Sequence, residues 1–217
     1  MARIRDTYLG QAWLVLILSL VFGGTLAGVH VGLNDRIEAN LRAETLSRIP
    51  ELVLGDEVGS RPDVVLLEDG MEVQMADGSM LAMQVSEQEV GGHQVFEVLR
   101  GDDRTRLGWV ARGAGQGYAD QIEILIGLRP DAQEITGLYV LSQKETPALG
   151  DAITGLPFRS RFVGVPADRA VEITKEERAA AADRSKILAL TAATISSQSV
   201  CDIVNRTVAD IRLELGK

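Results

Sequence analysis

Hydroxyl side chains gather in the segment Thr191–Ser197, which reads Thr-Ala-Ala-Thr-Ile-Ser-Ser. This segment lies directly before a helical pattern. The free backbone N–H groups of a helix N-terminus bind anions, so they can hold a phosphate near Thr194 without a lysine. Ser196 or Ser197 is expected to cap the helix. On composition alone, an ordinary capping segment explains the same residues.

A second candidate segment is Lys144–Asp151, which follows a predicted strand. Pro147 and Gly150 predict a turn, and Thr146, which precedes the proline, is expected to be extended. Such a loop can bring backbone amides and the apolar side chain of Leu149 against a flat ligand. Taken by itself, the segment predicts only a turn.

The third candidate is the glycine-rich stretch Gly113–Tyr118. It is not a dinucleotide-binding fingerprint, because the glycine spacing is wrong and no βαβ pattern surrounds it. Two interpretations stay open. The stretch is a flexible bend between strands, or its glycines let the backbone approach a ligand closely.

Two helices are expected around these segments. From Ser197 onward, apolar residues recur at steps of three and four, which predicts an amphipathic C-terminal helix. Its apolar positions are Val200, Ile203, Val204, Val208, Ile211 and Leu215. Alanines and charges predict a second helix over Glu172–Ala182.

Short β-rich runs separated by turn dipeptides predict an antiparallel sheet. The run Ile122–Leu128 is almost continuously apolar and is expected to be a central, buried strand. The fold class is therefore α+β, with an antiparallel sheet flanked by helices over residues 61–217. The expected strands are Val64–Leu67, Met71–Met75, Met80–Val85, Gln94–Leu99, Leu107–Arg112, Ile122–Leu128 and Glu134–Gln143.

The N-terminal part reads as a membrane anchor. Trp13–Leu33 is almost wholly apolar, and its 21 residues at roughly 1.5 Å each span the roughly 30 Å hydrocarbon core. Arg3 and Arg5 precede it, so the positive-inside bias places the N-terminus in the cytoplasm. Residues 1–34 are thus expected to be the cytoplasmic end and transmembrane helix. Residues 35–60 are expected to be a membrane-proximal helix, centred on Ile37–Leu54, and a linker.

Gly24, Gly28 and Gly32 recur every four residues in the apolar segment. Such a stripe lets another helix approach closely, which suggests that the chain is part of a larger assembly. Glycine is also simply common in membrane helices, and that explanation stays open.

Charge and composition narrow the function classes. The net charge of −9 argues against a nucleic-acid partner, because a phosphate backbone requires a Lys/Arg footprint. The single cysteine, Cys201, cannot form an internal disulfide and is expected to be a small residue inside a helix. The two histidines, His30 and His93, lie far apart, so no metal site is predicted.

The three candidate segments, in this order, resemble one protein family. They are Gly115–Tyr118, Glu145–Gly150 (Glu-Thr-Pro-Ala-Leu-Gly) and Thr191–Ser196. The chain is similar to the FMN-binding subunits of two related ion pumps. These are the G subunit of the Rnf ferredoxin–NAD oxidoreductase and the C subunit of the sodium-pumping NADH–quinone reductase. The resemblance covers most of the chain, is strongest over residues 107–215, and in length favours the Rnf protein.

The resemblance implies that Thr194 carries the cofactor covalently. Its Oγ would form a phosphoester with the ribityl phosphate of FMN, attached by a flavin transferase that uses FAD and Mg²⁺. The predicted helix N-terminus agrees with this, since the helix dipole favours a phosphate there. No residue is expected to be catalytic, because the cofactor carries the redox chemistry. The further cofactor-binding residues that the resemblance implies are Glu145, Thr146, Leu149, Gly150, Tyr118, Ala193 and Ser196.

Three positions depart from the family pattern. Family members usually have glycine where this chain has Ala148 and Ala192, and they often have aspartate where it has Leu188. Alanine does not readily adopt a positive φ, so Ala192 is expected to alter the local backbone or to weaken recognition by the transferase.

The implied function is electron transfer from ferredoxin toward NAD within an ion pump, with the other membrane subunits as partners. The implied location is the inner (cell) membrane of a bacterium, with the FMN domain on the periplasmic side. One alternative is a protein like the C subunit of the quinone-reducing pump, or another extracytoplasmic flavoprotein. The other is a membrane-anchored interaction subunit without a cofactor.

Overall fold

The computed structural model describes residues 8–58, 63–67 and 70–215. The chain divides into two compact units, Met1–Leu46 and Ser47–Lys217. The second unit holds all three candidate segments.

Helix α1 (Tyr8–Leu54) joins the apolar segment and the expected membrane-proximal helix in one continuous helix. The boundary between the units falls inside this helix, between Leu46 and Ser47. Among the described residues, α1 is the one helix that is long and apolar enough to cross a membrane. Arg3 and Arg5, on which the expected orientation depends, lie outside the described residues.

The second unit is built on an eight-stranded sheet whose neighbouring strands all pair antiparallel, in the order β1 to β8. This confirms the α+β class with an antiparallel sheet. The strands are β1 (Val64–Leu67), β2 (Gly70–Gln74), β3 (Met80–Val90), β4 (His93–Arg100), β5 (Arg106–Gln116), β6 (Gln121–Leu128), β7 (Glu134–Ser142) and β8 (Val165–Pro166). A short 3₁₀ helix, η2 (Gly55–Val58), follows α1.

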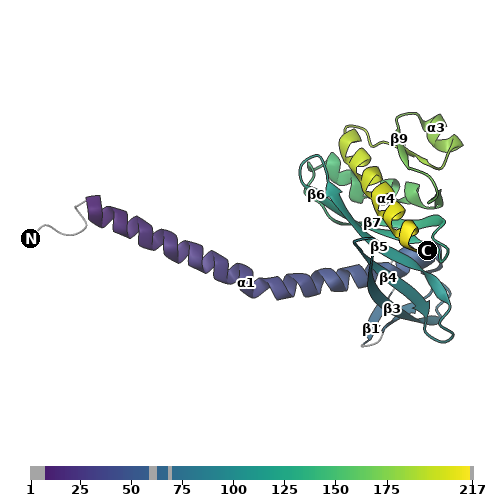
Figure 1. The fold of residues 1–217 in the computed structure, drawn as a ribbon, viewed down its shortest axis with the longest axis horizontal. Coiled ribbons are helices and arrows are strands. Elements are labelled where there is room, and N and C mark those ends of the chain that lie inside the picture. The colour runs from purple at the N-terminus through teal and green to yellow at the C-terminus, as the bar shows by residue number, and fades with distance from the viewer. Residues whose placement is uncertain (1–7, 59–62, 68–69, 216–217) are drawn as a thin grey trace, which may run out of the picture. The chain divides into compact units, whose positions relative to one another are not determined.

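Helix α4 (Thr194–Leu215) covers one face of this sheet and lies against β5 (Figure 1). Val200, Ile203 and Val204 are buried in the core against apolar residues of β5, β6 and β7. The predicted amphipathic pattern is thus confirmed, and Cys201 is buried in the same core. Strand β6 pairs with both β5 and β7 and is almost wholly buried, as its apolar run predicted.

The last turns of α1, within the second unit, pack on the opposite face of the sheet. Glycines on β5, β6 and β7 make the close approach possible. A Cβ on Gly108 would lie 3.0 Å from the Val53 side chain, and one on Gly127 would collide with the Leu52 carbonyl. The Thr136 hydroxyl donates to the same Leu52 carbonyl at 2.5 Å. Helices therefore flank both faces.

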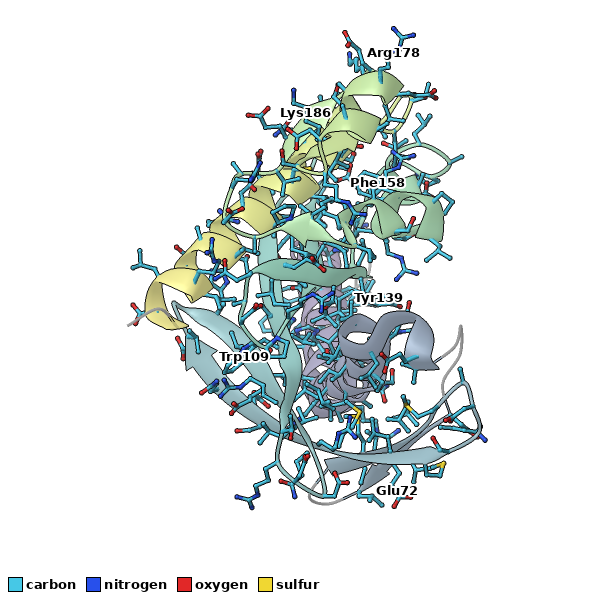
Figure 2. All side chains as sticks on the ribbon, turned by 90° about the vertical axis from the view of Figure 1, so that its right-hand side faces the viewer. Glu72, Trp109, Tyr139, Phe158, Arg178 and Lys186 are labelled. Carbon is cyan, nitrogen blue, oxygen red and sulfur yellow. The ribbon has the colours of Figure 1, made fainter. Side chains whose placement is uncertain are left out.

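The segment between β7 and α4 consists of short elements. They are η3 (Gly150–Thr154), α2 (Leu156–Arg159), η4 (Ser160–Phe162), β9 (Glu172–Thr174), α3 (Glu177–Ala182) and β10 (Lys186–Leu188), with β8 between η4 and β9. The prediction of one helix over Glu172–Ala182 was wrong at its start, because Glu172–Thr174 forms a parallel pair with Lys186–Leu188. Figure 2 shows Arg178 and Lys186 of this segment at one end of the unit, far from Glu72 of β2.

Candidate functional site

Helix α4 begins at Thr194, three residues before the expected start. The Ser197 N–H donates to the Ala193 carbonyl at 3.0 Å, which closes the first turn of the helix. The N–H groups of Thr194, Ile195 and Ser196 therefore belong to the open first turn, which has no intrahelical acceptors. This turn contains no acidic residue. Free N–H groups of this kind can bind an anion, and Thr194 is the first residue of the helix that offers one.

The prediction that Ser196 or Ser197 caps the helix was wrong, because both hydroxyls have other partners. The Ser197 hydroxyl donates to the Ala193 carbonyl at 2.9 Å and accepts from the Leu190 N–H at 3.1 Å. It therefore fixes the chain that leads into the helix. The Ser196 hydroxyl donates to Glu145 Oε2 at 2.5 Å, across 51 residues of sequence.

Glu145 is the residue at which the three candidate segments meet. Its side chain is buried, with 4% of the residue exposed. Oε2 accepts from Ser196, and Oε1 accepts from the Ala119 N–H at 3.0 Å. An O–H···O⁻ distance near 2.5 Å is typical of a charge-assisted hydrogen bond. The structure shows Glu145 holding protein segments together, and the role in cofactor binding that the resemblance implies stays a prediction.

Two glycines form a cradle around this carboxylate. A Cβ on Gly117 would collide with Glu145 Oε1 and lie 2.7 Å from the Asp120 carbonyl. A Cβ on Gly150 would lie 2.9 Å from both Glu145 Oε2 and Ser196 Oγ. Sequence reasoning included Gly150 but missed Gly117 and Ala119 as partners of Glu145. The only sequence feature that pointed to these two residues was their position on either side of Tyr118.

The turn after Glu145 closes on a single carbonyl. The Thr146 carbonyl accepts from the N–H groups of Leu149, Gly150 and Asp151 at 3.2, 3.0 and 3.3 Å. The predicted turn is thus confirmed, and Ala148 occupies it with φ of +61°. The Thr146 side chain is exposed, and Leu149 is 44% exposed.

Ala192 adopts φ of +64°, the left-handed conformation that favours glycine. Alanine thus adopts here the positive φ that its side chain disfavours, and weaker recognition by the transferase stays a prediction. The neighbouring Ala193 and Ser197 bonds hold Ala192 in this conformation. Ala148 and Ala192 thus both keep a glycine-like backbone, at a cost of roughly 1–2 kcal/mol each for the left-handed region.

Most of the glycine-rich stretch is strand, because Gly113–Gln116 belongs to β5, and only its end at Tyr118 enters the bend between β5 and β6. A Cβ on Gly113 would lie 2.5 Å from Thr207 Oγ1, and one on Gly115 would lie 2.6 Å from the Ile203 side chain. The glycines therefore allow a close approach, as the second interpretation proposed. In the structure, α4 approaches Gly113 and Gly115.

The candidate segments carry side chains that suit a flat, partly apolar group. Thr194 is half-buried, and Ala193 beside it is buried. Tyr118 and Ile195, from two of the three segments, are 64% and 57% exposed. A threonine hydroxyl, free N–H groups for a phosphate, and exposed apolar side chains together fit the attachment of FMN.

Leu188 lies in β10, and its carbonyl accepts a hydrogen bond from Arg161. Arg161 comes from η4, which sequence reasoning did not connect with the site. The backbone leading to Thr194 is therefore tied down at Leu188 by a side chain from a distant segment.

Comparison with known proteins gives the same assignment as the resemblance. The model of the FMN-binding domain family matches residues 117–209, which hold two of the three segments and the end of the glycine-rich stretch. The G subunit of an ion-translocating oxidoreductase complex from Methanosarcina acetivorans is 32% identical over 60% of this chain and 66% of its own length. The G subunit of a proton-translocating ferredoxin:NAD⁺ oxidoreductase complex from Clostridium ljungdahlii is 27% identical over 71% of this chain and 76% of its own.

Among solved structures, the C subunit of a Na⁺-translocating NADH–quinone reductase from Parabacteroides distasonis aligns with a TM-score of 0.47 and 19% identity. The alignment covers 56% of this chain and 62% of that one. The chain spans just under two thirds of the Methanosarcina acetivorans protein. The family match and the two G-subunit relatives agree on one conclusion: residues 117–209 of this chain are an FMN-binding domain, and the chain is similar to the G subunits of ion-translocating oxidoreductase complexes.

Proposed function

We propose that this chain is an electron-transfer subunit of an ion-translocating membrane oxidoreductase of the Rnf type, and that it carries FMN on Thr194 through a phosphoester. The observation that carries this proposal is the position of Thr194. Its hydroxyl belongs to a half-buried residue, the first of α4, inside the matched FMN-binding domain.

Different groups of the candidate segments would bind the phosphate and the ring of FMN. The first-turn N–H groups of α4 and the positive end of its dipole stabilise the phosphate. The exposed side chains of Tyr118, Leu149 and Ile195 offer apolar contact for the ring. When bound, FMN supplies one- and two-electron redox chemistry, so the protein need only position it and tune it.

We place the second unit outside the cytoplasm, anchored in the cell membrane by the apolar part of α1. The support is the length and composition of α1 and the arginines before it. A covalent bond suits this location, because a dissociated flavin would be lost there. The partners are then the membrane subunits of the complex and a flavin transferase that attaches FMN.

Two relatives favour the ferredoxin-linked pump over the quinone-linked one. The Methanosarcina acetivorans and Clostridium ljungdahlii proteins are both named as G subunits, and the second name specifies ferredoxin and NAD⁺. We therefore assign this chain to the path between ferredoxin and NAD⁺.

Intact-mass spectrometry tests the attachment. The wild-type chain, produced with a flavin transferase, is expected to be heavier by one FMN residue and to give a fluorescent band after denaturation. Thr194→Ala is expected to lose both signals and stay folded. The matched control is Thr191→Ala, which removes an exposed hydroxyl three residues away and should keep the flavin. A flavin-laden Thr194→Ala chain would contradict the proposal.

A further inference from the structure

We propose that Glu145 is a positioning residue that holds the first turn of α4, and with it the Thr194 hydroxyl, in the conformation that accepts FMN. Glu145 acts through Ser196 and does not itself contact the cofactor. The inference rests on the proposed attachment of FMN to Thr194, and it gives the buried carboxylate a different role from ligand binding.

The geometry shows how one side chain joins three segments. Oε2 of Glu145 accepts from the Ser196 hydroxyl at 2.5 Å, and Oε1 accepts from the Ala119 N–H at 3.0 Å. Gly117 and Gly150 close around the carboxylate so tightly that neither position has room for a Cβ. The carboxylate therefore fixes the distance between the β5–β6 connection, the turn after β7 and the start of α4.

In the described part of the chain, no cationic side chain helps to hold the Glu145 carboxylate. No lysine, arginine or histidine there forms an ion pair with Glu145, and the adjacent Lys144 pairs with Asp120 at 3.2 Å. A buried carboxylate is costly unless its oxygens are hydrogen-bonded. The Ser196 and Ala119 bonds are thus required, and each of them constrains the segment that donates it.

Ser196 transmits this constraint to Thr194. Ser196 is the third residue of α4 and is buried, whereas Thr194 is the first and is half-buried. In a helix, fixing one residue of the first turn fixes its neighbours, because they share consecutive backbone angles. Upstream, the bonds of Ser197 to Ala193 and Leu190 hold the other side of Thr194. Thr194 therefore sits between two anchors, and Glu145 provides the long-range one.

The test measures the rate of covalent FMN incorporation. Full-length chains made without a flavin transferase are incubated with that enzyme, FAD and Mg²⁺. The Thr194 Oγ–P bond forms as the pyrophosphate bond of FAD breaks, AMP leaves, and the FMN adduct is followed by intact mass. Glu145→Ala and Ser196→Ala are each expected to slow incorporation about 10- to 100-fold, the range for losing a charge-assisted hydrogen bond. Glu145→Gln should recover most of the rate, because its amide keeps an acceptor for Ala119 and offers Ser196 an N–H.

Two further comparisons separate positioning from general damage. The double variant Glu145→Ala/Ser196→Ala should be no slower than Glu145→Ala, because both changes break one interaction. Lys144→Ala, which removes the neighbouring exposed charge, should match the wild type. Hydrogen exchange on the flavin-free chains should show lost protection at residues 117–119 and 194–197 in Glu145→Ala, with the sheet core unchanged.

The outcomes are distinguishable from a failure of the proposed function. If the wild-type chain accepts no FMN, attachment at Thr194 is wrong, and hydrogen exchange alone decides whether Glu145 holds α4. Wild-type incorporation in Glu145→Ala would overturn the inference. So would multiplying effects in the double variant, or exchange that is unchanged at 194–197.

Discussion

The first turn of α4 and the body of the helix are held in place by different interactions. Along its body, Val200, Ile203 and Val204 pack against the sheet, and two glycines of β5 make room for the helix. At its first turn, polar groups and long-range hydrogen bonds replace apolar packing, and Glu145 is buried beside Ser196. Apolar packing gives the body its stability, whereas hydrogen bonds and a strained backbone give the first turn its specific shape.

The largest effect on stability is expected where β5 packs against the body of α4. Gly113→Ala would place a Cβ 2.5 Å from Thr207 Oγ1, so the helix must move or the strand must bend, which costs roughly 1–3 kcal/mol. Chemical denaturation of the wild type and the variant measures the loss. As a control, Gly155→Ala meets its nearest atom only at 3.2 Å and should lose less. Equal stability of Gly113→Ala and the wild type would refute the close packing of α4 on β5.

Just before the first turn of α4, removing a side chain is expected to stabilise the protein. Ala192→Gly relieves a left-handed alanine at φ of +64°, a strain of roughly 1–2 kcal/mol. The larger unfolded-state entropy of glycine offsets roughly 0.5–1 kcal/mol of that gain. The net change in unfolding free energy is therefore a gain of up to roughly 1.5 kcal/mol.

The same change on the body of the helix gives the matched control. Ala209→Gly replaces an exposed alanine inside α4 and should lose roughly 0.5–1 kcal/mol. Changes of opposite sign in the unfolding free energy of the two variants, measured under the same conditions, would support the contrast between the start of the helix and its body. A loss of stability in Ala192→Gly would contradict it.

The smallest expected effect at neutral pH is on the reactivity of the Cys201 thiol. Burial, with a minor contribution from the charge of Asp202, raises the pKa of its thiol from 9.0 to about 12. The native thiol should therefore resist alkylation at pH 8, because the thiolate is the reactive form. The chain unfolded in urea should react readily. Rapid labelling of the native chain would show that the body of α4 opens.

The same pKa shift has a stability consequence at high pH. Because the folded pKa is raised, the stabilisation from the protonated thiol is fully present below about pH 9 and is lost as the pH rises toward 12. The unfolding free energy of the wild type should then fall over that range more steeply than that of Cys201→Ala.

The contrast also explains what could be predicted from sequence. The body of α4 follows from apolar periodicity, and the buried strand β6 follows from a continuous apolar run; both are local properties of the sequence. The start of α4 does not, because the Ser196 hydroxyl bonds to Glu145, 51 residues away, and is unavailable as a cap. Likewise, the strand Glu172–Thr174 forms only through pairing with Lys186–Leu188.

The sequence predicted which segments form the candidate site. It did not predict how these segments contact one another. Motif resemblance included Thr194, Glu145 and Ser196, and the structure brings the last two together. It did not reveal that Glu145 joins the three segments, because Gly117 and Ala119 contribute only space and a backbone N–H. Such contributions depend on the folded path of the chain and leave little trace in side-chain chemistry.

The most direct test of the central claim is to locate the flavin within the chain. Wild-type protein produced with a flavin transferase is digested, and the fluorescent peptide is sequenced by tandem mass spectrometry. We predict one flavin peptide, which contains residues 191–197 and bears the FMN phosphoester on Thr194. A flavin on Thr191, Ser196 or any other residue, or a chain that carries no covalent flavin, would contradict the account.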